Sequence, residues 1–208
     1  MNAGANADVH NSLTVCVYCG SGHGSKSAYT EAANTLGTQL ARQGLKLIYG
    51  GGGLGLMGAV ARAALLEGGD VTGIMPLFLS EREQQLEQLT ELVVVDNMHE
   101  RKMAMFERSD AFVALPGGIG TLEELVEQLT WAQLGQHKKP VILANIEGFW
   151  NPFLQLLEDM RKEAFIRKEL EVRVEIVNSA DDIVPSLIKL IPSAEQNMRA
   201  RLDVKSKF

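Results

Sequence analysis

The residues best suited to chemistry lie in two short stretches, NMHERK at 97–102 and PGGIGTLEE at 116–124. The first places Arg101 and Lys102 in the opening turns of an expected helix, where the helix dipole disfavours cations by roughly 0.3–1 kcal/mol each. A nearby anion would remove that penalty. The second stretch ends in Glu124, so the two together offer a pair of cations and a carboxylate. Such a set predicts a site that holds an anionic substrate beside an ionisable group.

The second stretch also carries an unusual number of glycines, Gly117, Gly118 and Gly120, just before an expected helix over 122–134. Thr121 as N-cap with Glu124 three residues later would form a capping box, but a capping box does not explain the glycines. Glycines at a helix N-terminus present backbone N–H groups to an anion. No lysine follows at P-loop spacing, so the pattern favours a monophosphate over a magnesium-bound triphosphate.

A third glycine stretch, GGGLGLMG at 51–58, satisfies the G-x-G-x-x-G pattern. It lacks the acidic residue about 20 positions later that a dinucleotide site needs, and it follows the second strand rather than the first. It therefore predicts either close approach of the backbone to a small ligand or a tight turn against a helix.

The sequence holds no other convincing catalytic set. Cys16 and Cys19 fall within an expected strand and are interpreted as buried thiols rather than a redox or zinc pair. His99 is interpreted as a packing or capping residue. No metal cluster and no Ser/His/Asp arrangement can be recognised from spacing, so no metal is expected.

Alternating elements would bring these stretches together. Apolar runs predict strands over 13–19, 45–50, 70–75, 91–96, 111–116, 140–145 and 174–179, and helices are expected over 27–43, 56–67, 98–108, 122–134, 149–162 and 180–190. This order predicts an α/β fold, a Rossmann-like doubly wound parallel sheet of about seven strands with helices on both faces. The stretches 20–25, 51–58, 97–102 and 116–124 each follow a strand, so all are expected at the carboxyl edge, where such sheets bind ligands.

Bulk properties limit the possible partners. The chain has 208 residues, 46% of them hydrophobic, and a formal net charge of −6. One domain over 13–192 is expected, between tails at 1–12 and 193–208. The negative charge argues against a nucleic acid polymer as partner. No signal peptide and no apolar run long enough to cross a membrane is recognised, so a cytoplasmic protein is expected.

These stretches resemble the Lonely Guy family of cytokinin riboside 5′-monophosphate phosphoribohydrolases, whose members are often mislabelled lysine decarboxylases. The motif P-G-G-x-G-T-x-x-E stands at 116–124 and M-H-x-R-K at 98–102, with CGS after the first strand and GGGxxGLMG after the second. The resemblance runs from about 15 to 190. It implies hydrolysis of the N-glycosidic bond of adenosine 5′-monophosphate (AMP) or an N6-substituted AMP, without a cofactor, by a dimer with its sites near the interface.

The resemblance also implies roles for individual residues. Arg101 and Glu124 would be catalytic. Gly22 departs from the family pattern, because many members have a second serine there. Substrate contacts are implied for Ser21, Glu83, Met98, Lys102, Gly117, Gly118, Ile119, Gly120, Thr121 and Thr130.

Three other functions can be weighed against this one. A non-catalytic nucleotide carrier or sensor would keep the glycines but would need neither Arg101 nor Glu124. A nucleoside deoxyribosyltransferase would use a glutamate as nucleophile and would form a covalent sugar adduct. A lysine decarboxylase would need a lysine for pyridoxal phosphate, and Lys102 is the only lysine beside the motifs.

Overall fold

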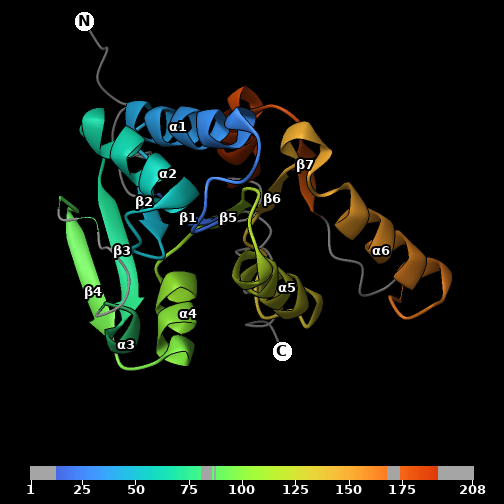
Figure 1. The fold of residues 1–208 in the computed structure, drawn as a ribbon. Helices are drawn as coiled ribbons and strands as arrows, with labels where there is room; N and C mark the ends of the chain where they lie inside the picture. The colour runs from blue at the N-terminus through green and yellow to red at the C-terminus, as the bar shows by residue number, and fades with distance from the viewer. Residues whose placement is uncertain (1–12, 81–85, 87, 168–173, 192–208) are drawn as a thin grey trace, which may run out of the picture.

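The fold is a seven-stranded sheet with helices on both faces, seen in a computed structural model that describes residues 13–80, 86, 88–167 and 174–191 (Figure 1). All neighbouring strands are parallel, and their order is β4-β3-β2-β1-β5-β6-β7. Every expected strand is confirmed, as is the doubly wound α/β class. The strands are β1 (Thr14–Tyr18), β2 (Lys46–Tyr49), β3 (Val71–Pro76), β4 (Glu91–Val95), β5 (Ala111–Ala114), β6 (Val141–Ala144) and β7 (Glu175–Val177).

Burial explains the sequence of the central strands. All four residues of β5 and of β6 are buried, as strands covered on both faces must be. Val15 of β1 pairs with Leu47 of β2 on one side and with Ala111 of β5 on the other. The edge strand β4 instead has exposed positions, among them Leu92 and Val94. The core therefore sits around the middle of the sheet.

Two helical layers cover the sheet (Figure 1). On one face α1 (Ser27–Arg42), α2 (Gly55–Leu66) and a helix over 183–191 share an apolar cluster with side chains of β1 and β2. On the other face lie α4 (Met98–Glu107), α5 (Ile119–Gln133) and the start of α6 (Asn151–Lys162). Shorter elements are α3 (Leu77–Ser80) and the 3₁₀ turns η1 (Ile146–Gly148) and η3 (Ala180–Asp182).

The strand order reverses at β1. From β1 the chain runs outward through β2, β3 and β4, and then returns to place β5 on the other side of β1. The loops after β1 and β5 therefore leave the sheet in different directions, which opens a crevice at the carboxyl edge. The glycine-rich stretch expected to bind an anion, 116–124, begins at this crevice.

Cys16 of β1 and Cys19, which directly follows this strand, are free and buried. Burial raises the pKa of both thiols well above the ordinary range, so they stay protonated and unreactive. The interpretation of Cys16 and Cys19 as packing residues is confirmed. Among the described residues, no helix is both long and apolar enough to span a bilayer.

Candidate active site

A cavity of about 240 Å³ opens at the crevice between the loops that follow β1 and β5. Backbone hydrogen bonds tie these loops together: Gly20 N–H donates to the Pro116 carbonyl at 3.1 Å. Aromatic rings of Tyr29 and Phe149 form part of its wall. The polar part of the lining comes from Ser21, Gly22, His23, Gly117 and Gly118.

The amino end of α2 does not face this cavity with free amides. Leu56 N–H donates to the Gly20 carbonyl at 3.0 Å, and Met57 N–H donates to the same oxygen at 3.3 Å. Gly55 has a φ of +58°, and a Cβ there would lie 2.3 Å from the backbone of Ser21. The 51–58 glycines thus pack α2 against the loop after β1, which is the tight-turn alternative for the G-x-G-x-x-G pattern.

The amino end of α5 is open instead. Its N-cap is Gly118, which has no side chain to cap the first turn, and Gly118, Ile119 and Gly120 are exposed. The first N–H groups of a helix have no partner within the helix, so this end can accept an anion. Because Gly117 and Gly118 also line the cavity, an anion bound there would lie at the helix terminus.

The expected capping box is wrong, because α5 begins at Ile119 rather than at 122. Thr121 lies inside the first turn and cannot be the N-cap. Its side chain is buried against Gly117, where a Cβ would lie 2.1 Å from Thr121 Oγ1. Gly117 is therefore required by the packing of this turn. Asn97 caps the start of α4, where Glu100 N–H donates to Asn97 Oδ1 at 3.0 Å.

Arg101 is buried, with 9% of its surface exposed, and its guanidinium is held from three sides. Nε donates to the Ile74 carbonyl of β3 at 3.0 Å, and Nη2 donates to the Gly50 carbonyl at 3.4 Å. Nη1 lies 3.8 Å from the sulfur of Met98. A Cβ on Gly50 would lie 2.1 Å from Nη2, so the absence of a side chain there makes room for the guanidinium. Met98 thus supplies an apolar side chain beside the guanidinium.

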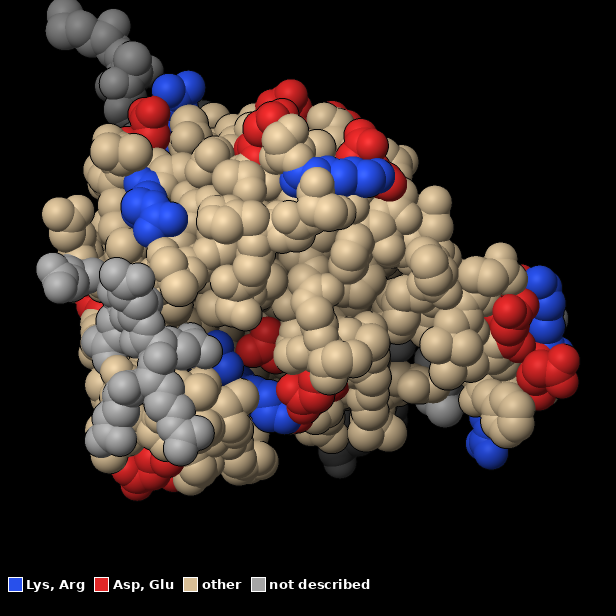
Figure 2. Space-filling model, in the orientation of Figure 1, with Lys and Arg blue, Asp and Glu red and all other residues tan. Residues whose placement is uncertain are grey.

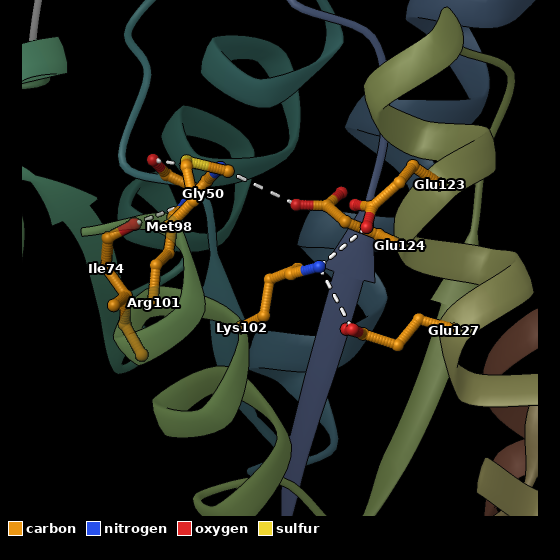
Figure 3. A network of polar contacts seen from close by, with 8 residues as sticks. All are labelled: Gly50, Ile74, Met98, Arg101, Lys102, Glu123, Glu124 and Glu127. Atoms are coloured by element: carbon orange, nitrogen blue, oxygen red, sulfur yellow. Dashed lines mark hydrogen bonds and ion pairs between the residues drawn. The ribbon is translucent and has the colours of Figure 1, made fainter.

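Glu124 faces Arg101 from α5, with Oε1 lying 3.6 Å from Arg101 Nη1 (Figure 3). It is also 9% exposed. Burial is the main cause that raises the pKa of Glu124 to about 7. The positive charges of Arg101 and Lys102 lower this pKa, and the negative charges of Glu123 and Glu127 raise it. The carboxyl group can therefore take or release a proton near neutral pH, a property common among groups that act in catalysis.

Lys102 adds a second set of charges beside this pair. Its ammonium lies 2.6 Å from Glu123 Oε1 and 3.0 Å from Glu127 Oε1 (Figure 3). Figure 2 shows the basic and acidic side chains gathered between α4 and α5. Sequence reasoning missed Glu123 and Glu127, although Glu127 lies one helical turn after Glu124 and so could have been placed on the same face.

The structure thus brings together most, but not all, of the residues singled out from the sequence. Arg101, Glu124, Met98 and Lys102 meet between α4 and the first turns of α5, and Ser21, Gly117 and Gly118 line the cavity. Thr130 lies apart from both groups: its hydroxyl donates to the Val126 carbonyl, and it lines a groove between α5 and α6. Glu83 lies outside the described residues. In the part of the chain that the structure describes, no group of three or more His, Cys, Asp or Glu could hold a metal ion.

The raised pKa of Glu124 predicts how stability depends on pH. Between its ordinary value of 4.5 and about 7, the folded protein binds more protons than the unfolded chain. Stability is therefore expected to fall as pH rises through this window, by about 3 kcal/mol in the free energy of unfolding. Urea unfolding at pH 5 and pH 8 measures the difference, and Glu124→Gln should remove it.

Glu67→Gln is the matched control, because this exposed carboxylate pairs with Arg42 and its pKa is lowered. Its charge therefore does not change above pH 5. An equal pH dependence in the wild-type protein and in Glu124→Gln would contradict the burial of an ionisable Glu124.

Comparison with known proteins agrees with the family seen in the motifs. The sequence profile of a family described as "Possible lysine decarboxylase" matches residues 57–187. The cytokinin riboside 5′-monophosphate phosphoribohydrolase LOG of Oryza sativa subsp. japonica is 46% identical over 181 residues, which are 87% of this chain and 75% of that protein. The enzyme LOG1 of Arabidopsis thaliana is 44% identical over 182 residues, 88% of this chain and 85% of its own length.

Solved structures support the fold alone. The molybdenum cofactor binding protein of Rippkaea orientalis aligns with a TM-score of 0.65 at 21% identity, over 86% of this chain and 97% of its own. The Moco carrier protein of Chlamydomonas reinhardtii also reaches 0.65 at 21% identity, over 87% and 98% of the two chains. At 21% identity these similarities support the doubly wound fold and say nothing about the function of this chain.

Proposed function

We propose that this chain, which belongs to the Lonely Guy family of cytokinin riboside 5′-monophosphate phosphoribohydrolases, hydrolyses AMP or an N6-substituted AMP to the free base and ribose 5-phosphate. The observation that carries the proposal is the buried pair of Arg101 and Glu124, 3.6 Å apart, beside the open amino end of α5. A carrier or sensor would need the phosphate site but would have no use for a buried acid facing a guanidinium.

The 5′-phosphate is assigned to the amino end of α5. Unpaired N–H groups and the helix dipole favour an anion there. Ser21 reaches the same cavity from the loop after β1. The contacts we propose for the phosphate and ribose are those of Ser21, Gly117, Gly118, Ile119, Gly120 and Thr121.

The reaction breaks the bond between C1′ and the base nitrogen, and a water oxygen bonds to C1′. The bonding electrons leave with the base, which takes up a proton. The transition state gives the sugar an oxocarbenium-like positive charge, against which carboxylates are the usual groups. Glu124 would stabilise that charge or orient the water. Arg101 would position the nucleotide and favour departure of the base, while phosphate binding holds the reacting centre in place.

The direct test is chromatographic detection of adenine and ribose 5-phosphate after incubation with AMP, with N6-isopentenyl-AMP as a second substrate. Adenosine is expected to react with a kcat/KM about 10²-fold or more below that of AMP, because it lacks the group that orients the sugar. Equal rates for AMP and adenosine would contradict the phosphate site. Binding of AMP without release of base would favour the carrier, and a trapped sugar adduct would favour a deoxyribosyltransferase.

The residues do not fit the pyridoxal phosphate that a lysine decarboxylase would need. A Schiff-base lysine acts as a neutral amine. Lys102 instead lies against two carboxylates, and hydrogen bonding to Glu123 is the main cause that raises its pKa. Its ammonium form is therefore favoured. The absorption spectrum of the purified protein tests this reading.

We also propose that the chain forms a homodimer through a groove between α5 and α6. The groove measures about 370 Å³ and has an apolar lining that includes Val126, Leu156, Met160 and Phe165, all exposed. The apolar side chains of α5 divide here: Leu125 and Leu129 belong to the core, whereas Val126 lies on the surface. Burying such a patch against a second copy would remove it from water.

Val126→Glu is expected to convert a dimer to a monomer, because the charge would have to be buried at the interface. Sedimentation velocity measures the change. Leu66→Glu on α2 is the matched control, since Leu66 is 86% exposed and lies outside the groove. A wild-type protein that sediments as a monomer, or a Val126→Glu variant that stays dimeric, would refute the interface.

A cytoplasmic location is proposed as well. It is supported by the free thiols of Cys16 and Cys19, because free cysteines are usual in reducing compartments.

A further inference from the structure

A second ion-paired contact runs beside the Arg101–Glu124 pair. Lys102 follows Arg101 on α4, and Glu127 follows Glu124 by one turn on α5. The Lys102 ammonium points between α4 and α5 and contacts Glu127 Oε1 at 3.0 Å (Figure 3). The same two helices are therefore joined twice, once at each pair.

The two contacts differ in length. Arg101 Nη1 and Glu124 Oε1 are 3.6 Å apart, outside hydrogen-bond range. The hydrogen bonds of Arg101 go to the backbone of Ile74 and Gly50, on the β2–β3 side of the site. The hydrogen bonds of Lys102 go to α5. In the described residues, the short polar contacts between α4 and α5 are thus those of Lys102, and they stand beside the apolar packing of Phe106 on Trp131.

Of the two glutamates that hold Lys102, Glu127 is better placed to fix it. The side chain of Glu127 is 20% exposed, whereas that of Glu123 is 51% exposed. Water and salt screen an exposed pair more than a sheltered one. Glu127 Oε2 is also buried and has no hydrogen-bond partner among the described residues. Removing Lys102 would therefore leave a sheltered carboxylate without its counter-charge.

We propose that Lys102 and Glu127 form a clamp between α4 and α5 that positions Arg101 opposite Glu124 for hydrolysis. The inference rests on the proposed function. It makes both members of the clamp positioning residues, and it replaces the substrate contact that the family resemblance implies for Lys102. Their effect on the reaction passes through the geometry and charge of the catalytic pair.

The clamp also acts on the proton equilibrium of Glu124. The positive charge of Lys102 lowers the pKa of Glu124, and the negative charge of Glu127 raises it. Removing one or the other should therefore move this pKa in opposite directions, while the loss of kcat reports the positioning. The other ionisable groups that interact with Glu124 are Arg101 of α4, Glu123 of α5, and Cys16, Tyr18 and Cys19 of β1 and its end.

The test is a double-mutant cycle with Lys102→Met and Glu127→Gln, assayed on AMP and on adenosine. Each single variant is expected to lower kcat about tenfold, with KM for AMP within about twofold of wild type. The double variant should lose no more than either single variant, because both remove the same contact. The pKa in the pH profile of kcat/KM should rise in Lys102→Met and fall in Glu127→Gln.

Glu67→Gln serves as control, since this glutamate also pairs with a basic residue across two helices, but at α1 and α2. It is expected to leave kcat, KM and the pH profile unchanged. Glu127→Asp is a second variant, which keeps the charge but draws it away from Lys102. It should also lower kcat, and circular dichroism checks that each variant is folded.

Two results would overturn the clamp while leaving the proposed function intact. One is a Lys102→Met variant with wild-type kcat and a raised KM for AMP but not for adenosine, which would make Lys102 a phosphate contact. The other is a Glu127→Gln variant with wild-type kcat and pH profile. If the wild-type protein releases no base from any monophosphate, the proposed function itself fails.

Discussion

Glu124→Gln is expected to lower kcat for AMP hydrolysis about a thousandfold while the protein keeps its fold. The amide has nearly the shape of the carboxyl group but lacks the negative charge that would face the positive sugar. It also cannot exchange a proton near pH 7, where Glu124 titrates. KM for AMP should change much less, because the amino end of α5 is proposed to bind the phosphate. Chromatographic assay of adenine at saturating AMP measures the loss.

Glu123→Gln is the control for this substitution. It removes one charge from the neighbouring position of α5, but Glu123 is exposed and does not face Arg101. Its kcat should fall only a few-fold. A Glu124→Gln protein with a normal circular dichroism spectrum and undiminished turnover would remove Glu124 from the mechanism.

Arg101→Lys is expected to lower kcat/KM about a hundredfold, although the charge is kept. The guanidinium contacts the carbonyls of Ile74 and Gly50 while another nitrogen faces Glu124. A single ammonium cannot make these contacts from three directions. The lysine should therefore leave its place between β2, β3 and α5, and the substrate would lose its positioning group.

Arg108→Lys tests whether any arginine of this region behaves in the same way. Arg108 is the C-cap of the same helix and pairs with Glu91 at an exposed site. Its replacement should leave kcat/KM within about twofold of wild type. If Arg101→Lys also leaves kcat/KM within about twofold of wild type, the contacts of the Arg101 guanidinium have no part in the reaction.

Much of the fold could be predicted because its signals are local. The run Val15 to Tyr18 is apolar at successive positions, as expected for a strand covered on both faces, and the same holds for β5 and β6. The start of α5 was missed because its N-cap is Gly118, which offers no side-chain oxygen. Rules based on capping side chains pointed to Thr121, which is instead buried in the first turn.

The pair proposed to be catalytic could be located because Arg101 and Glu124 stand in long motifs that follow strands. The residues around them were harder to find. Gly50 and Ile74 hold Arg101 through their backbone carbonyl oxygens. Every residue has such a carbonyl, so the residue types at these positions do not indicate the contact. Thr130 could not be assigned from its place in α5, because only the packing of α6 shows that it lines the groove.

The tight fit between Gly50 and the Arg101 guanidinium offers a way to sort related sequences by activity. Even a methyl group at position 50 would lie 2.1 Å from Nη2, so the guanidinium would have to shift from the place that it holds opposite Glu124. A homologue that retains the arginine and glutamate but carries another residue in place of this glycine would therefore hold the two groups in a different arrangement. Position 50 is thus a residue to compare when related chains differ in activity.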